Sequence, residues 1–176
     1  MDAAHFVFAP FLGYLWCFVR MFVKAPSGRK RFNVLGALNA INHEMVVITN
    51  TGYINACSVC ELLIKLTQRC GDLPISIVLD NARYQKCKLV QQTAKVFDIE
   101  LLYLPAYSPN LNLIERMWKF VKKKCLYSKY YPNFEEFTES ISQCLTKTNT
   151  WYKKELDSLL SLNFQSFSKS YIFRTI

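Results

Sequence analysis

Residues 108–124 read SPNLNLIERMWKFVKKK, and they follow a shorter stretch, LDNAR, at 79–83. Asp80 directly follows the apolar run ISIVL, which is typical of a short, buried central strand. Thirty-four residues separate it from Glu115, which falls in the first turn of a predicted basic helix over 111–126. Ligand sites in open α/β sheets lie at the carboxyl ends of strands, so these two acids can share one site.

Asp2 adds a third acid near the beginning of the sequence. Acids that are distant in sequence but meet at one sheet edge are what a Mg²⁺ site for phosphoryl transfer requires, because Mg²⁺ prefers oxygen ligands. Each acid also has an ordinary alternative. Asp80 can cap the turn after its strand, and Glu115 can pair with Lys119 one helical turn on. Asp2, at the second position, can fray with the chain end.

The predicted helix around Glu115 is amphipathic. At 100° per residue it has one apolar stripe, and Glu115, Lys119 and Lys122 lie just beside the edge of that stripe. A carboxylate in this position can reach the rim of a sheet on which the helix packs. Trp118 is predicted to lie in the core and not to stack on bases. The stripe consists of Ile114, Met117, Trp118, Val121 and Cys125.

Hydrophobic periodicity predicts the order of the remaining elements. A strand, a turn and a strand span 1–24, strands follow at 32–41 and 45–49, then a helix at 55–70, a strand at 75–79, a helix at 86–97, a strand at 100–104, and helices at 111–126, 134–145 and 153–160. This is the order of an RNase H-like α/β fold, with a mixed five-stranded sheet, helices on both faces and extra C-terminal helices. One domain is expected over 1–165, with a C-terminal tail at 166–176.

The composition fits one domain with a real core, since hydrophobic residues make up 51% of the 176 residues. A net charge of +9 favours a polyanionic partner, although solvated lysine faces are the common alternative. Seven cysteines, an odd number, favour reduced thiols and a cytoplasmic protein. The apolar run from Phe6 to Val19 is too short for a membrane helix and contains Pro10 and Gly13, so we predict a buried hairpin and no membrane partner.

Four stretches together resemble the catalytic half of a mariner-superfamily transposase from a bacterial insertion sequence. They are DAAHF at 2–6, GRKRFNVLGALNA at 28–40, LDNARYQ at 79–85 and LPAYSPNLNLIERMWKFVKK at 104–123. The resemblance runs from residue 2 to about 165, and its last two motifs are the specific ones. It implies an Asp-Asp-Glu (DDE) triad on an RNase H-like fold. Asp2, Asp80 and Glu115 would then be the catalytic residues and the ligands of two Mg²⁺ ions, for which Mn²⁺ can substitute.

The resemblance also implies an activity and its partners. The enzyme would nick double-stranded DNA at the ends of the element, and the resulting 3′-hydroxyl would attack target DNA. Relatives of this kind act as homodimers on paired ends and favour TA targets. Because the substrate is chromosomal DNA, we expect the enzyme to act on the bacterial nucleoid. Two alternatives stay open: a stand-alone RNase H-like nuclease or junction resolvase, and a catalytically inactive DNA-binding remnant. Strand-transfer products would separate the first alternative, and metal-dependent nicking the second.

Basic residues in two places are the candidates for DNA contacts, because Lys and Arg neutralise phosphates without reading sequence. They are Arg29, Lys30 and Arg31 in a loop, and Arg116, Lys119, Lys122, Lys123 and Lys124 on the helix. In this family a helix-turn-helix region precedes the catalytic half, whereas only Met1 precedes Asp2 here. We therefore expect a first strand truncated at its N-terminus and a chain that does not transpose DNA by itself. Such a chain would be the second half of a frameshifted protein or a decayed fragment.

Overall fold

The computed structural model describes residues 1–8, 18–20, 22, 30–105, 108 and 111–164. The predicted order of strands and helices is confirmed within these ranges, with small shifts at the element ends, except for the second strand predicted within 1–24, which is not found among the described residues 18–20 and 22. The elements are β1 (Asp2–Val7), β2 (Arg31–Leu38), β3 (Met45–Asn50), α1 (Ala56–Cys70), β4 (Ile75–Leu79), α2 (Lys88–Val96), β5 (Ile99–Tyr103), α3 (Ile114–Cys125), α4 (Phe134–Lys147) and α5 (Lys153–Leu159).

Local signals define the ends of α1. The side chain of Asn55 accepts a hydrogen bond from the backbone N–H of Ser58 at 3.1 Å, and the Ser58 hydroxyl accepts from the N–H of Asn55 at 3.4 Å. This capping box satisfies donors that a helix start leaves unpaired. The helix ends at Gly71, whose φ of 60° is left-handed and suits a residue without a side chain. These caps fix the length of the helix that covers one face of the fold.

The strands form two sheets. β1, β2 and β3 make an antiparallel sheet in that order, with Asp2 opposite Gly36, and β4 and β5 make a separate parallel pair. The prediction of one continuous, five-stranded mixed sheet is therefore wrong. The nitrogen of Met1 donates to the carbonyl of Val78 at 2.7 Å, and among the described residues this is the one backbone bond between the two sheets. The start of β1 lies level with the end of β4, so the two strands have almost no length over which to pair.

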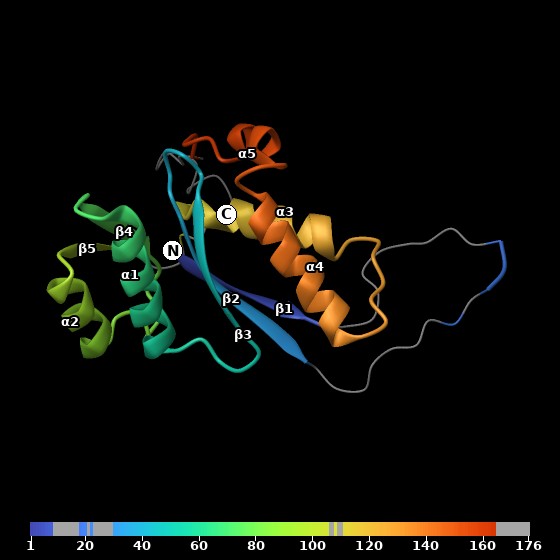
Figure 1. Ribbon diagram of the computed structural model, residues 1–176, viewed down its shortest axis with the longest axis horizontal. Coiled ribbons are helices and arrows are strands. Elements are labelled where there is room, and N and C mark those ends of the chain that lie inside the picture. Colours follow the sequence, from blue (N-terminus) through green and yellow to red (C-terminus); the bar gives the residue numbers. More distant parts are fainter. Residues whose placement is uncertain (9–17, 21, 23–29, 106–107, 109–110, 165–176) are drawn as a thin grey trace, which may run out of the picture.

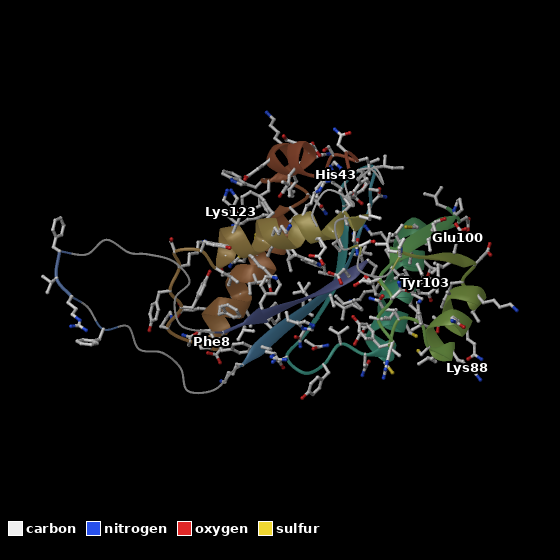
Figure 2. All side chains as sticks on the ribbon, turned by 180° about the vertical axis from the view of Figure 1, so that it is seen from behind. Phe8, His43, Lys88, Glu100, Tyr103 and Lys123 are labelled. Atoms are coloured by element: carbon white, nitrogen blue, oxygen red, sulfur yellow. The ribbon has the colours of Figure 1, made fainter. Side chains whose placement is uncertain are left out.

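Two apolar cores lie on opposite faces of the three-stranded sheet. Figure 1 shows α1 and α2 on one side of this sheet and α3 and α4 on the other. The first core, here named the α3 side, joins β1 and β2 to α3, α4 and α5. The second core, named the α1 side, joins β2 and β3 to α1, α2, β4 and β5. Phe8 of the α3 side and Tyr103, which packs against the α1 side, lie toward opposite ends of the molecule (Figure 2). The predicted helices on both faces of the sheet are thus confirmed.

The apolar run from Phe6 to Val19 is described only at its two ends. Phe6 and Phe8 are buried on the α3 side, whereas Phe18 and Val19 are exposed and lie outside any strand. The predicted buried hairpin is therefore wrong at its second arm, and its turn lies outside the described residues. Apolar residues contribute much of any protein surface, so composition alone could not decide burial. None of the described helices combines the length and the apolar character that a membrane crossing requires.

Candidate active site

Asp2 is the first residue of β1 and is only 7% exposed. It lies on the same face of the strand as Ala4 and Phe6, and this face packs against α3. The indole Nε1–H of Trp118 donates to Oδ2 of Asp2 at 3.0 Å. Asp2 is therefore held in place in the interior of the fold. His5, on the other face of β1, instead contacts Asn33 through its Nδ1 at 2.6 Å.

Asp80 follows β4 directly and is half-buried. Two hydrogen bonds fix the backbone beside it: Asn81 Nδ2 donates to the Leu104 carbonyl at 2.5 Å, and the Leu104 N–H donates to the Leu79 carbonyl at 2.8 Å. Oδ1 of Asp80 is buried and accepts no hydrogen bond from any residue that the structure describes. A buried acceptor without a donor is costly, so this oxygen does not cap a turn, and a cation is one partner that would remove the cost.

Glu115 lies half-buried in the first turn of α3, as predicted. Among the described side chains no ion pair joins it to Lys119, so its carboxylate is not committed to that alternative partner. The residue at the N-cap of this helix is Leu113, which makes no side-chain cap bond. Asn112 donates through Nδ2 to the Met1 carbonyl at 3.4 Å. This bond ties the beginning of α3 to the beginning of β1.

The negative charges of the three acids act on one another. The pKa of Asp2 is raised from 3.8 to about 6, chiefly by burial and also by the nearby carboxylates of Asp80 and Glu115, while a backbone hydrogen bond from Ala3 acts in the opposite direction. Burial also raises the pKa of the Tyr84 hydroxyl, and the charges of Asp2 and Asp80 add to this effect. Like charges close together oppose ionisation, so the site is an electrostatically crowded cluster of acids.

The structure thus brings Asp2, Asp80 and Glu115 into one region from β1, β4 and α3. Within the described part of the chain, no group of three His, Cys, Asp or Glu side chains lies close enough together to hold a metal ion. The three carboxylates thus lie in the same region, but they are not as close together as ligands of one metal ion would be. The donor chemistry still fits a hard cation, because all three groups offer carboxylate oxygens and Oδ1 of Asp80 has no hydrogen-bond partner in the described part of the chain.

The predicted DNA contacts lie in different surroundings. Arg29 lies outside the described residues. Lys30 and Arg31 are exposed at the start of β2. On α3, Lys119 and Lys123 are exposed, Lys122 and Lys124 are half-buried, and Lys123 is labelled in Figure 2. Lys124 binds Glu155 of α5 through its Nζ at 2.8 Å, so its charge is partly balanced within the protein.

Arg116 uses its donors within the chain. Its guanidinium donates to the backbone carbonyls of Leu159 at 3.3 Å, Ser161 at 2.6 Å and Asn163 at 2.7 Å. It also lies 5.4 Å from the centre of the Phe164 ring. Arg116 therefore attaches the segment after α5 to the beginning of α3. The sequence carried no signal for this role, because its partners are carbonyl groups more than forty residues away.

The bond between Trp118 and Asp2 was also missed. The amphipathic pattern correctly predicted a buried Trp118, which is 2% exposed. A buried indole N–H usually finds an acceptor, and this rule could have prompted a search for one among the nearby acids.

Comparison with known proteins decides the family. A family model described as "DDE superfamily endonuclease" matches residues 19–138, a range that includes Asp80 and Glu115. The chain belongs to the DDE endonuclease superfamily. The match leaves Asp2 of this DDE protein outside its range. No curated protein matches the sequence.

Solved structures share the fold of this DDE protein. The Mos1 mariner paired-end complex with Mn has a TM-score of 0.66 at 15% identity, covering 95% of the DDE chain and 55% of the Mos1 chain. The catalytic domain of Mos1 mariner transposase has a TM-score of 0.56 at 16% identity, over 74% and 70% of the two chains. The HTLV-2 integrase catalytic core domain in complex with magnesium has a TM-score of 0.54 at 15% identity, over 85% and 83%.

These similarities establish the fold, which is the RNase H-like fold of transposase and integrase catalytic cores. The DDE chain spans about half the length of the Mos1 chains in the DNA complexes, 50% to 56%.

Proposed function

We propose that this chain is the catalytic domain of a mariner-superfamily transposase from a bacterial insertion sequence. It would nick double-stranded DNA at the ends of the element and join the freed 3′-hydroxyl to target DNA, with a preference for TA. One observation carries the proposal: Asp2 accepts a hydrogen bond from Trp118 of the helix that carries Glu115, and Met1 beside it donates to the carbonyl of Val78, two residues before Asp80. Membership of the DDE superfamily supports the same function.

Asp2, Asp80 and Glu115 are the residues that would hold two Mg²⁺ ions, or Mn²⁺ in their place. Their carboxylates match the preference of these cations for oxygen ligands, and the unpartnered Oδ1 of Asp80 offers an acceptor that is already desolvated. When bound, the ions would supply Lewis-acid activation of the attacking oxygen and charge stabilisation of the leaving oxygen.

The chain itself positions the acids and the DNA. Asn81 fixes the backbone that carries Asp80, and Trp118 and Asn112 hold the beginning of β1. The exposed lysines of α3 follow Glu115 along the same helix and would neutralise backbone phosphates of DNA bound there. A phosphodiester would in this way be delivered beside the acids without sequence-specific contacts.

The proposal extends to organisation and location. A catalytic domain over 1–165 would be followed by a tail at 166–176, and the protein would act as a homodimer on paired ends in the bacterial cytoplasm, at the nucleoid. The dimer and the DNA ends belong to the proposal because Mos1, the similar transposase, has been solved as a paired-end complex.

Plasmid nicking tests the proposal. The chain should convert supercoiled plasmid to the open circular form with Mg²⁺ or Mn²⁺ and not with EDTA. Asp80→Asn should reduce nicking by at least about a hundredfold, because a displaced or lost catalytic group costs that much or more. Its circular dichroism spectrum should stay that of the wild type. The matched control is Asp72→Asn, a change in the exposed turn after α1, which should nick normally. Normal nicking by Asp80→Asn would refute the assignment.

A second assay separates a transposase from a plain nuclease. Pre-cut DNA ends with a free 3′-hydroxyl should be joined to a target plasmid by a transposase, whereas a hydrolase gives no joined product. Joined products that disappear in Glu115→Gln are the expected result. Nicking without any joining would favour a nuclease or resolvase on the same fold.

A further inference from the structure

The indole of Trp118 lies between two residues that face each other across a pair of strands. It is 2% exposed, and its one polar atom donates to Oδ2 of Asp2 at 3.0 Å. Asp2 on β1 is paired in register with Gly36 on β2. The contact therefore joins α3 to the strand pair at the position of the first acid.

The indole ring of Trp118 packs directly against Gly36. A Cβ atom added at Gly36 would lie 2.8 Å from Cη2 and 3.1 Å from Cζ2 of Trp118, and 3.1 Å from Cε of Met45. Distances below 3.0 Å do not occur for real Cβ contacts, so the ring rests directly on the glycine backbone. The ring is thus fixed by the glycine at one end and by the carboxylate at the other.

We propose that Trp118 is a positioning residue that holds the carboxylate of Asp2 for metal binding. Gly36 contributes because its lack of a side chain lets the indole ring pack directly on the backbone of β2. This role rests on the proposed function of Asp2 as a metal ligand. Trp118 lies three residues after Glu115 on the same helix. One rigid helix therefore carries one acid and the donor that orients another, which keeps the two acids in a fixed relation.

A neutral donor suits this task. A carboxylate has about four lone-pair sites, so the bonds from the Trp118 indole and the Ala3 backbone leave sites on Asp2 that a cation can use. A lysine or arginine in the same place would balance the negative charge and compete with the cation for it. The indole orients the group and leaves its full charge in place.

Two substitutions test the role by different routes, each with a matched control. Trp118→Phe removes the N–H donor and keeps a ring, whereas Gly36→Ala keeps the donor and displaces the ring. Trp151→Phe changes a tryptophan that is 82% exposed, and Gly52→Ala adds a methyl group where no atom lies within 4 Å. The binding of Mn²⁺ alone to each full chain is measured by calorimetry, well below the unfolding temperature of every variant.

Both test variants should bind Mn²⁺ more weakly by about 10- to 100-fold, the usual worth of a hydrogen bond to a charged group, and both controls should bind as the wild type does. A purely structural role would lower the unfolding temperature and leave the Mn²⁺ affinity unchanged. Wild-type affinity in both Trp118→Phe and Gly36→Ala would overturn the proposal.

A second measurement needs no metal. The indole N–H signal of Trp118 in ¹H–¹⁵N spectra, identified by its loss in Trp118→Phe, should exchange slowly with solvent and should shift and exchange faster in Asp2→Ala. An unchanged signal in Asp2→Ala would refute the contact itself. A wild-type chain that neither binds Mn²⁺ nor nicks DNA would overturn the proposed function, and with it this role. The indole signal would then still show whether Trp118 holds Asp2, so the two failures can be distinguished.

Discussion

Replacing Asp2 with Asn should stabilise the metal-free protein at neutral and alkaline pH. Burial and the charges of Asp80 and Glu115 raise the pKa of Asp2 from 3.8 to about 6. The folded state therefore binds a proton more tightly than the unfolded state. The stability that this group contributes is present at low pH and is lost as the pH rises through about 6. The pKa difference corresponds to about 3 kcal/mol of unfolding free energy, at about 1.36 kcal/mol for each tenfold change in the proton equilibrium.

The amide of Asn keeps an oxygen that can accept from Trp118 but carries no charge. In EDTA at about pH 8, Asp2→Asn should thus exceed the wild type in unfolding free energy by as much as about 3 kcal/mol, and the advantage should shrink toward zero near pH 4. Burial lowers the pKa of the Met1 amine to about 6, and the charge of Asp2 opposes this lowering. Without that charge the pKa of the amine falls further, so at pH 8 the amine is neutral in both folded proteins and does not alter the comparison there.

Urea unfolding of both proteins at several pH values measures this difference. The exposed Asp72→Asn serves as the control and should show no such pH-dependent gain. The reasoning fails if Asp2→Asn is less stable than the wild type at pH 8, or if its advantage is the same at every pH.

Three further predictions concern DNA, the segment after α5 and the core. Replacing Lys119 and Lys123 by Glu should weaken binding to any DNA duplex and reduce the slope of log affinity against log salt by about 2. Fluorescence anisotropy with terminal-repeat and scrambled duplexes measures both quantities. A hundredfold or larger preference of the wild type for the repeat would reveal a sequence-recognition element in addition to these lysines. Arg116→Ala should speed amide hydrogen exchange in the segment after α5 and cost about 1–3 kcal/mol; unchanged exchange would show that the three carbonyl bonds do not hold that segment. Ile141→Ala, at a fully buried position of α4, should lower the unfolding free energy by about 2–5 kcal/mol in urea titrations. Ile64→Ala, at a partly exposed position, should lower it clearly less. Equal losses of unfolding free energy would contradict the assigned core.

The sequence was sufficient where signals were local. The strand at 75–79 was predicted with its observed bounds, because Pro74 and Asp80 enclose a short apolar run. The apolar stripe of α3 was likewise predicted with its buried members, although Phe120 is buried as well. Hydrophobic periodicity, together with proline and acidic residues at the ends of an element, specifies such elements within a few residues of sequence.

Long-range relations were beyond the sequence. Continuity of the sheet depends on how far β1 and β4 overlap, and nothing in either strand alone specifies that overlap. The partners of Asp2 and Arg116 are an indole and backbone carbonyls that are distant along the chain. Phe18 was predicted to be buried because it is apolar, but it is exposed. Apolar character alone gave no indication of its surroundings.

The break between the two sheets has a mechanical consequence. Asp2 and Glu115 belong to elements of the α3 side, Asp80 follows a strand of the α1 side, and one backbone bond joins the tips of β1 and β4. The spacing of the acids therefore depends on how α1 and the β4–β5 pair slide against the three-stranded sheet. Any ion shared by all three acids would add a direct link between the end of β4 and the beginnings of β1 and α3. Its binding would therefore raise the free energy of unfolding and hold the two sheets in one arrangement.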